Sequence, residues 1–230
     1  MLPLIRAHDP PDYFPPVEHA LDEPNGLLAA GGDLSPQRLL AAYTRGIFPW
    51  YSEGDPILWW SPDPRTVFKV GELHISRRLA RTLRQTPLRI TFNQSFAAVI
   101  QACAKPRRNK QGNQDADTWL TPEMQTAYIH LHELGHAQSV EVWKDNQLVG
   151  GLYGLPIGRV FCAESMFSKV SDASKIALYH LDQWLQEKSY YYIDAQVGSG
   201  HLYRMGARDI PRSELIPYLS PEQNVSNLMR

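Results

Sequence analysis

RVFCAESMFSKVSDASKIALYHLDQWLQEKSYYYIDAQV, residues 159–197, contains two short apolar runs on either side of one long amphipathic run. The apolar runs predict strands at Arg159–Ala163 and Tyr190–Val197, and the spacing between them predicts a helix at Ser174–Lys188. This order indicates a strand–helix–strand step. The step completes the predicted sheet, and the elements before it supply the rest of the domain.

The segments before this step predict a hairpin and several helices. Gln138–Trp143 and Gln147–Leu155 are typical of strands and are joined by an Asp-Asn turn. Helices are expected at three places: Ser76–Gln85, Ser95–Cys103, and a segment that Thr121 opens as N-cap and Gly135 closes. Together these elements predict an α+β domain over residues 64–230.

The first 63 residues have a different composition, rich in proline, glycine and aromatic residues. Ser35 and Pro36 are typical of an N-cap and a first helical residue, so a short helix is expected at Pro36–Arg45, ended by Gly46. The rest of this part is too rich in turns to form a large core of its own. We therefore predict a small N-terminal lobe, residues 1–63, packed on the α+β domain.

The whole chain has the composition of a globular protein, since 43% of its 230 residues are hydrophobic and 20% are charged. Its first residues contain no apolar run of the roughly 7–15 residues that a secretory signal needs. No stretch approaches the ~20 apolar residues of a membrane span. The two cysteines, Cys103 and Cys162, are too few for a disulfide framework or a zinc ribbon. These features favour a cytoplasmic protein without a membrane partner.

Positive charge is concentrated in one segment of a chain whose net charge is −1. Residues 65–110 contain eleven Lys or Arg and one acid, whereas the remainder contains twelve bases and twenty-three acids. On the helix predicted at Ser76–Gln85, Arg77, Arg81 and Arg84 fall within an arc of about 60° opposite the apolar side. A basic stripe of this kind predicts a polyanionic partner, with nucleic acid the first candidate. The alternative is a solvated helix face whose acidic neighbours come from elsewhere in the fold.

The sequence HELGH fits the H-E-x-x-H motif of zinc hydrolases, with His132 and His136 as ligands and Glu133 as the base. We do not adopt this interpretation, although Glu164 is a conceivable distant third ligand. No G-x-x-H follows, and Gly135 stands where the helix is expected to end, so His136 would lie off the ligand face. We instead predict a helix end with two histidines near the negative end of its dipole, and no metal.

Two places carry polar residues in otherwise apolar strands. In YYYIDAQV, Asp194 and Gln196 would point to one face of a strand, and Glu164 ends the apolar run RVFCAE. Buried polar groups need hydrogen-bond partners. Each of these residues, taken alone, is therefore most simply explained as forming a structural hydrogen bond. Because both places flank one amphipathic helix, we predict a cleft with an apolar floor, lined by Glu164, Asp194 and Gln196.

A coenzyme A site is not expected, because SMFSKVSDASK before the long helix lacks a glycine-rich pyrophosphate loop. No P-loop or dinucleotide fingerprint is present, so no cofactor is predicted. Most aromatic residues of the first lobe are expected in the core or between the lobes. Trp50 and Trp119 stand beside polar or turn residues, and we predict that both are partly exposed, as base stacking needs.

Several long motifs together resemble the leucyl/phenylalanyl-tRNA–protein transferase family: EPNGLLAAGGDLSPQRLLAAYTRGIFPW, DPILWWSPDPR, HELGHAQSVEVW, GGLYG, FCAESMFS, ASK and IDAQV. The match runs from about Glu23 to Pro211. The resemblance implies a C-terminal domain similar to the GNAT acyltransferase fold. It also implies transfer of Leu or Phe from aminoacyl-tRNA to proteins with N-terminal Arg or Lys, which marks them for N-degron degradation. We expect Met to be used less well, and we expect a monomer.

The resemblance also assigns roles to individual residues. Asp194 and Gln196 match the family's proposed catalytic pair, and Glu164 matches the acid that contacts the incoming basic N-terminal residue. Trp50 and Trp119 match aromatic residues near the aminoacyl-adenosine end. The aminoacyl side-chain pocket is matched by Leu152, Phe161, Met166, Ile193 and Val197. The tRNA-binding basic patch is matched by Arg77, Arg78, Arg81 and Arg84.

The implied reaction needs positioning more than activation, because an aminoacyl-tRNA ester is already activated. Asp194 would polarise Gln196, which orients the attacking amine and helps to disperse its proton. The alternative is substrate-assisted catalysis through the terminal ribose hydroxyl, with both residues only orienting. Two other function classes stay open at this point, a zinc metallopeptidase and a non-catalytic RNA-binding module.

Overall fold

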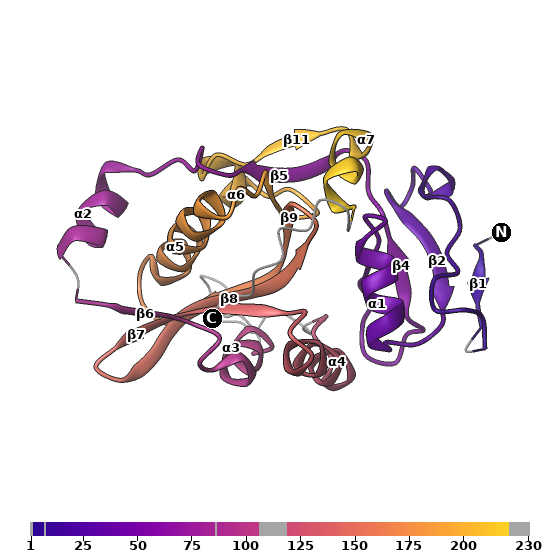
Figure 1. Cartoon of the computed structure of the whole chain (residues 1–230), viewed down its shortest axis with the longest axis horizontal. Coiled ribbons are helices and arrows are strands. Elements are labelled where there is room, and N and C mark those ends of the chain that lie inside the picture. The colour runs from indigo at the N-terminus through magenta and orange to yellow at the C-terminus, as the bar shows by residue number, and fades with distance from the viewer. Residues whose placement is uncertain (1, 7, 86, 106–118, 221–230) are drawn as a thin grey trace.

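The computed structural model describes residues 2–6, 8–85, 87–105 and 119–220. It contains a four-stranded sheet in the N-terminal part and a seven-stranded sheet in the remainder (Figure 1). The smaller sheet has the strand order β1 (Leu4–Ile5), β2 (Leu27–Gly31), β4 (Leu58–Trp60), β3 (Phe48–Pro49). The larger has the order β11 (Arg208–Ile210), β5 (Arg65–Lys69), β10 (Tyr192–Asp194), β9 (Val160–Ser168), β8 (Gln147–Ile157), β7 (Gln138–Lys144), β6 (Arg89–Phe92).

The predicted strand–helix–strand step is present. β9 and β10 pair in parallel, with Ile193 opposite Phe161 and Asp194 opposite Cys162, and α5 (Ala173–Glu187) joins them. β9 is longer than predicted because it pairs with β8 as far as Ser168. β10 is shorter than predicted, since it ends at Asp194 and not at Val197. The two parallel strands therefore separate just beyond Asp194.

The predicted hairpin forms the middle of the large sheet. β7 and β8 are joined by Asp145 and Asn146, whose φ angles of 48° and 61° suit a two-residue hairpin turn. Three further strands that the sequence analysis did not predict, β5, β6 and β11, complete the sheet at its two edges.

Helices cover both faces of this sheet (Figure 1). α5 and α2 (Arg77–Gln85) pack on one face, and α3 (Phe96–Cys103) and α4 (Pro122–Glu133) pack on the other. Successive strand residues therefore point into different cores: Ile193 contacts the α5 side, whereas Tyr192 contacts the α3–α4 side. Thr121 caps α4 as predicted, by accepting the Met124 N–H.

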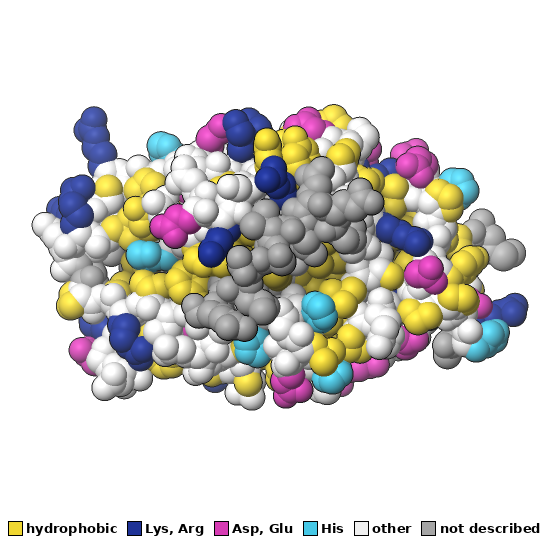
Figure 2. All heavy atoms as spheres, viewed as in Figure 1, with side chains coloured by type: hydrophobic (Ala, Val, Ile, Leu, Met, Phe, Trp, Pro, Cys, Tyr) yellow, Lys and Arg dark blue, Asp and Glu magenta, His cyan; other side chains and the backbone are white. Residues whose placement is uncertain are grey.

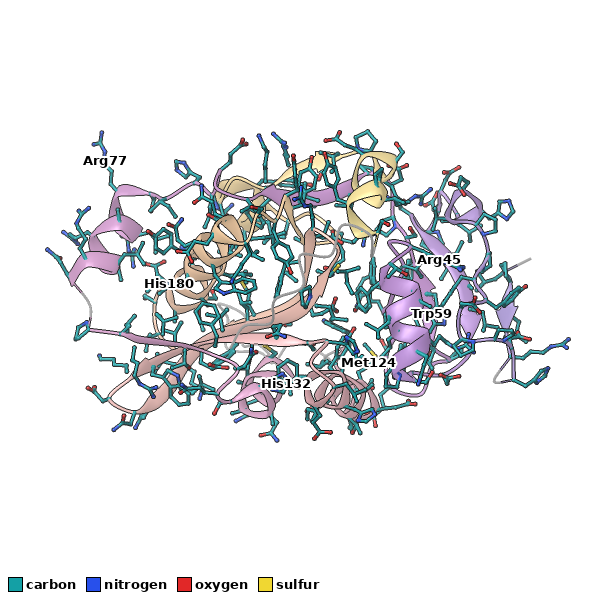
Figure 3. All side chains as sticks on the ribbon, in the orientation of Figure 1. Arg45, Trp59, Arg77, Met124, His132 and His180 are labelled. Carbon is teal, nitrogen blue, oxygen red and sulfur yellow. The ribbon has the colours of Figure 1, made fainter. Side chains whose placement is uncertain are left out.

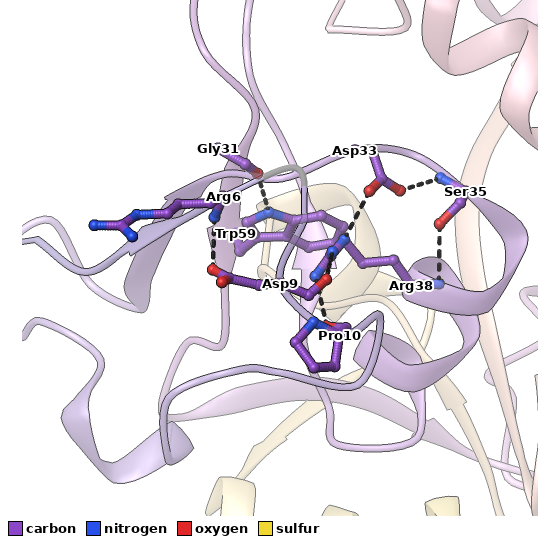
Figure 4. Close-up of polar contacts among 8 residues, drawn as sticks. All are labelled: Arg6, Asp9, Pro10, Gly31, Asp33, Ser35, Arg38 and Trp59. Atoms are coloured by element: carbon purple, nitrogen blue, oxygen red, sulfur yellow. Dashed lines mark hydrogen bonds and ion pairs between the residues drawn. The ribbon is translucent and has the colours of Figure 1, made fainter.

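The N-terminal lobe is organised by a buried arginine (Figure 4). Arg38 lies on α1 (Pro36–Tyr43), which Ser35 caps as predicted. Its guanidinium pairs with Asp33 at 3.2 Å and donates to the carbonyls of Asp9 and Pro10, which fixes the N-terminal segment on the helix. α1 ends two residues earlier than predicted.

The two parts share one continuous core. Tyr43, Phe48 and Trp59 from the N-terminal lobe belong to the same buried cluster as Tyr128 and Leu155 from the larger domain. The remaining short helices are η1 (Val17–His19), α6 (Gly200–Arg204), α7 (Arg212–Leu215) and η2 (Ile216–Leu219). None of the helices in the described ranges is long and apolar enough to cross a membrane.

Candidate active site

Glu164 lies at a bulge in β9. Two neighbouring residues of β8, Tyr153 and Gly154, pair with Ser165 and Ala163, so Glu164 between them has no partner across the strands. A bulge of this kind redirects a side chain. Only glycine fits at position 154, since a Cβ there would lie 2.1 Å from a carbonyl oxygen of β9.

The Glu164 carboxylate accepts hydrogen bonds from two side chains. Tyr128 Oη donates to Oε2 over 3.1 Å, and Gln196 Nε2 donates to Oε1 over 3.1 Å. The Tyr128 hydroxyl also bonds to the Tyr43 hydroxyl, which belongs to α1 of the N-terminal lobe. Burial raises the pKa of Glu164 to about 7, although the two tyrosine hydroxyls act in the opposite direction. The carboxyl is therefore only partly ionised at neutral pH.

Asp194, at the end of β10, organises the turn that follows it. Its oxygens accept from Arg65 Nε and Nη2 over 2.9 and 2.8 Å, and Oδ1 also accepts the backbone N–H of Gln196 over 2.9 Å. The Val197 N–H then donates to the Ala195 carbonyl over 2.7 Å, which makes a γ-turn centred on Gln196. The φ of Gln196 is 58°, a conformation that is strained for any residue but glycine.

This turn contradicts part of the predicted cleft. Asp194 is fully buried and lines neither of the cavities described next, so its prediction as a cleft residue is wrong. The physical reason is that alternation of side chains holds only while the backbone is extended, and the chain turns at Gln196. Asp194 contacts the main chain of Gln196, whereas the side-chain amide of Gln196 contacts Glu164.

Two cavities meet at Glu164 and Gln196. The first, about 250 Å³, lies against the N-terminal lobe and is lined by Phe48, Pro49, Trp50, Trp119, Glu164, Ala195, Gln196 and Val197. The second, about 340 Å³, lies inside the larger domain, and its apolar wall includes Phe68, Leu152, Met166, Leu178, Ile193 and Leu202. Its polar lining consists of Glu164, Ser165, Gln196, Ser199 and His201. Trp119 and Ala195 line both cavities as well.

The junction offers two chemically distinct groups. Glu164 presents a carboxylate that can pair with a cation. Gln196 uses its Nε2 on Glu164, and no described residue donates to its Oε1, which is left to accept from a bound ligand. An apolar pocket beside a hydrogen-bond acceptor and an acid suits a ligand with an uncharged side chain and a reacting partner that carries positive charge.

Comparison with known proteins decides the family. Residues 67–220 match the family model of leucyl/phenylalanyl-tRNA protein transferase, and residues 32–63 match that of its N-terminal domain. The leucyl/phenylalanyl-tRNA–protein transferase of Pseudomonas aeruginosa is 57% identical over 206 residues, which cover 90% of this chain and 89% of the relative. The protein of the same name from Aromatoleum aromaticum is 58% identical over 213 residues, covering 93% and 86%.

This chain belongs to the leucyl/phenylalanyl-tRNA–protein transferase family. The family resemblance found in the sequence is confirmed, and with it the aminoacyltransferase activity and the two-part α+β organisation. A solved structure of L-PGS from Bacillus licheniformis is also similar, with a TM-score of 0.41 and 12% identity over 76% of this chain and 57% of that one.

The residues predicted for the aminoacyl pocket of the transferase do not all lie together. Leu152, Met166 and Ile193 line the second cavity. Phe161 is fully buried and lines neither cavity. Val197 is 55% exposed and lines the first cavity, because the turn at Gln196 carries it away from the second.

The two predicted aromatic residues of the transferase have the exposure that was expected. Trp50 is 46% exposed and Trp119 is half-buried, which confirms the prediction that both are partly exposed. They line the first cavity together, and the Trp50 ring also contacts Trp60 at 5.5 Å between centroids.

Several residues at this site were missed by the sequence analysis. They are Tyr43, Phe48, Arg65, Phe68, Tyr128, Leu178 and His201. Most are apolar or aromatic residues with ordinary helix or strand spacing, so the sequence contains no local signal for them. Arg65 had a weak signal, since it is a basic residue directly before the short segment TVF, and the two together prove to be a buried strand.

The predicted basic helix is exposed. Arg77, Arg78, Arg81 and Arg84 are all accessible on α2, and Figure 2 shows Lys and Arg side chains at this end of the molecule. Arg77 projects away from the body of the protein (Figure 3). Arg78 pairs with Asp172 at 3.4 Å, so its charge is partly neutralised within the protein.

The HELGH segment has the geometry of a helix end. α4 ends at Glu133, and Gly135 follows with a φ of 86°, so His136 lies beyond the helix as predicted. His132 Nδ1 contacts the Ala137 carbonyl at 2.7 Å. Its ring stacks on Phe96, with 4.2 Å between centroids, so its surroundings are those of a packed side chain.

Proposed function

We propose that this transferase moves Leu or Phe, and Met less well, from aminoacyl-tRNA to the α-amine of proteins that begin with Arg or Lys. The product N-terminus then marks those proteins for N-degron degradation in the cytoplasm, and the enzyme acts as a monomer whose N-terminal lobe ends near residue 63. The observation that carries the proposal is the junction of an apolar cavity with a partly buried carboxylate and an amide oxygen.

The second cavity is proposed to hold the aminoacyl side chain. Its apolar wall offers dispersion and burial to Leu or Phe and little to a polar side chain. The first cavity, with Trp50 and Trp119, is proposed to hold the terminal adenosine by stacking. The ester carbon would then lie at the junction, beside Gln196.

Glu164 is proposed to select the acceptor. A partly buried carboxylate at the junction pairs with the guanidinium or ammonium of an N-terminal Arg or Lys. The α-amine of the same residue is then close to Gln196 Oε1, which accepts one of its hydrogens and aims the nitrogen lone pair at the ester carbon.

The chemical step forms one bond and breaks another. The neutral amine attacks the ester carbonyl, the C–N bond forms, and the C–O bond to the ribose breaks, while the nitrogen loses a proton and the ribose oxygen gains one. An amide oxygen is a weak base, so Gln196 orients the amine and does not keep its proton. With a pKa of ~8, roughly a tenth of the amine is neutral at pH 7 without help.

The decisive experiment is a transfer assay with the purified full-length chain. Labelled Leu-tRNA is mixed with an Arg-initiated peptide, and matched peptides that begin with Lys, Ala or Glu are run beside it. We expect label in the Arg and Lys peptides only. Equal labelling of the Ala peptide would show that Glu164 does not select the acceptor, and no labelling of any peptide would refute the proposed acceptor class.

The exposed arginines of α2 are proposed to bind the phosphates of the tRNA. Arg77, Arg81 and Arg84 extend the site toward a polyanion without acidic partners among the described residues. They act at a distance from the junction, so they would contribute affinity and not chemistry.

A further inference from the structure

Arg65 connects the two sides of the first cavity, the first by direct contact with Phe48 and the second through Asp194. One side is formed by Phe48–Trp50 of the N-terminal lobe, and the other by Ala195–Val197 after β10. On the first side, the guanidinium lies 5.0 Å from the centroid of the Phe48 ring, and Nη1 donates to the Gly46 carbonyl over 2.8 Å. On the second side, Nε and Nη2 bond to Asp194.

These contacts are buried from end to end. The Arg65 side chain is 1% exposed and the Asp194 side chain is fully buried, so separating the two would leave an uncompensated buried charge. Asp194 in turn accepts the Gln196 N–H. A continuous series of contacts therefore runs from the wall that carries Trp50 to the turn that carries Gln196.

An arginine suits this place better than a lysine. The guanidinium presents its N–H groups in a fixed plane, so one side chain can bond to the carboxylate with two of them and to a carbonyl on the other side with a third. A lysine ammonium keeps the charge but has no fixed fork, and it would leave at least one wall free to shift.

We propose that Arg65 is a positioning residue for the transfer reaction, which sets the Gln196 turn at a fixed distance from the Phe48–Trp50 wall. The proposal rests on the role that Gln196 has in the proposed function. Arg38 provides the contrast, because it is equally buried and paired with Asp33, but the described residues that its guanidinium bonds to, Asp33, Asp9 and Pro10, all belong to the N-terminal lobe (Figure 4).

A double-mutant cycle tests the proposal. The single-turnover rate of transfer is measured with saturating aminoacyl-tRNA and Arg-initiated peptide for the wild type, Arg65→Lys, Gln196→Ala and the double variant. We expect Arg65→Lys to lower the rate by roughly tenfold to a hundredfold, the size of effect that a small misplacement produces. In the Gln196→Ala background the same change should lower it much less, because the group that is positioned is absent.

Arg38→Lys is the matched control. It should lower the melting temperature, as Arg65→Lys does, but leave the rate per folded molecule unchanged. A wild-type rate for Arg65→Lys would overturn the proposal, as would an equal loss in both backgrounds, which is the result for a residue that only stabilises the fold.

The remaining outcomes are also decisive. If Arg65→Lys does not fold, Asp194→Asn replaces it in the cycle, since asparagine keeps an oxygen for the Gln196 N–H and removes the charge that Arg65 binds. A wild-type rate for Gln196→Ala would overturn both this proposal and the role of Gln196. If Gln196→Ala lowers the rate but Arg65→Lys has the same effect in the presence and absence of Gln196, only the positioning proposal is overturned.

Discussion

The side-chain nitrogen of Gln196 lies 3.1 Å from Oε1 of Glu164, although Glu164 lies at a bulge in β9 and Gln196 lies in the turn that follows β10. The bulge in β9 and the γ-turn after β10 bring these side chains together at the point where two cavities meet. This contact orients the amide, because its nitrogen donates to the carboxylate and its oxygen receives no hydrogen bond from a described residue.

Gln196→Ala should reduce turnover and leave substrate affinity nearly unchanged, since the amide oxygen acts on the attacking amine during the reaction. We expect a loss of roughly tenfold to a hundredfold in kcat. The measurement is transfer rate against peptide concentration at saturating aminoacyl-tRNA. Gln147→Ala, at the exposed β7–β8 turn, is the matched control and should behave as the wild type. A rise in KM without a fall in kcat would place Gln196 in binding only.

Glu164→Gln should weaken the binding of Arg- and Lys-initiated peptides through loss of a charged hydrogen-bonding partner, which is worth roughly 1.5–3 kcal/mol. The defect should also depend on pH. Because the pKa of Glu164 is about 7, the wild-type carboxyl becomes neutral as the pH falls below that value, and its advantage over glutamine should disappear.

The comparison is the ratio of peptide KM values for the variant and the wild type between pH 6 and 8.5, which cancels the titration of the peptide amine. A constant ratio would contradict the assignment. Stability provides a second readout, because a raised carboxyl pKa contributes stability below the ordinary value near 4.5 that is lost as the pH rises through about 7. In Glu164→Gln, the free energy of unfolding should no longer fall over this pH range, because glutamine does not titrate.

Tyr128→Phe should raise the pKa of Glu164 further, because it deletes a hydroxyl that donates to the carboxylate. The rise in peptide KM on acidification should then begin at a higher pH than in the wild type. Tyr153→Phe is a close control, since Tyr153 is also buried beside Tyr128 but its hydroxyl has no hydrogen-bond partner among the described residues. Identical pH profiles for wild type and Tyr128→Phe would show that this hydroxyl does not hold Glu164.

Replacing Arg77, Arg81 and Arg84 by Ala should weaken tRNA binding and flatten its dependence on salt. Each phosphate contact that is lost should reduce the slope of log K against log salt by up to ~1. Arg45→Ala, at an exposed arginine in the N-terminal lobe, away from α2 (Figure 3), is the control and should leave the slope unchanged. An unaltered slope in the triple variant would place the tRNA on another surface.

Donor choice should follow the shape of the second cavity. Leu-tRNA and Phe-tRNA should be used well and Met-tRNA somewhat less, whereas Ile and Val should be poor because branching at Cβ crowds the ester. A missing methylene alone accounts for only ~1–3 kcal/mol of discrimination. Competition between charged tRNAs in one reaction measures the ratios of kcat/KM directly, and equal use of Ile and Leu would be incompatible with this cavity as the donor site.

The sequence alone predicted the position of those helices and strands whose hydrophobic residues have a strong periodicity. α5, α2 and the β7–β8 hairpin lie within a residue or two of their predicted bounds, because amphipathic spacing and turn residues act locally. The resemblance to the family predicted the activity. The alternating pattern Ile-Asp-Ala-Gln-Val, however, predicted a strand to Val197 that the structure does not contain.

The strand was predicted too long because the residue that ends it, Arg65, is far away in the sequence. Arg65, 129 residues before Asp194, holds the carboxylate that holds the Gln196 turn, and no local pattern indicates this partner. Glu164 was predicted at the site, but its bulge depends on the register of β8 against β9. The geometry of a buried ion pair or a bulge follows from tertiary packing, which periodicity does not encode.

The hydroxyl contact between Tyr43 and Tyr128 links the N-terminal lobe to the larger domain next to Glu164. A substitution on α1 that displaced Tyr43 would be felt by the carboxyl on β9, so the two parts cannot accumulate changes independently at these positions. The small lobe and the large domain should therefore function only as a matched pair. Exchanging lobes between distant relatives should produce chimaeras that fold but in which the Glu164 carboxyl is no longer correctly hydrogen-bonded. Under such a constraint, positions 43 and 128 should be substituted together in related sequences.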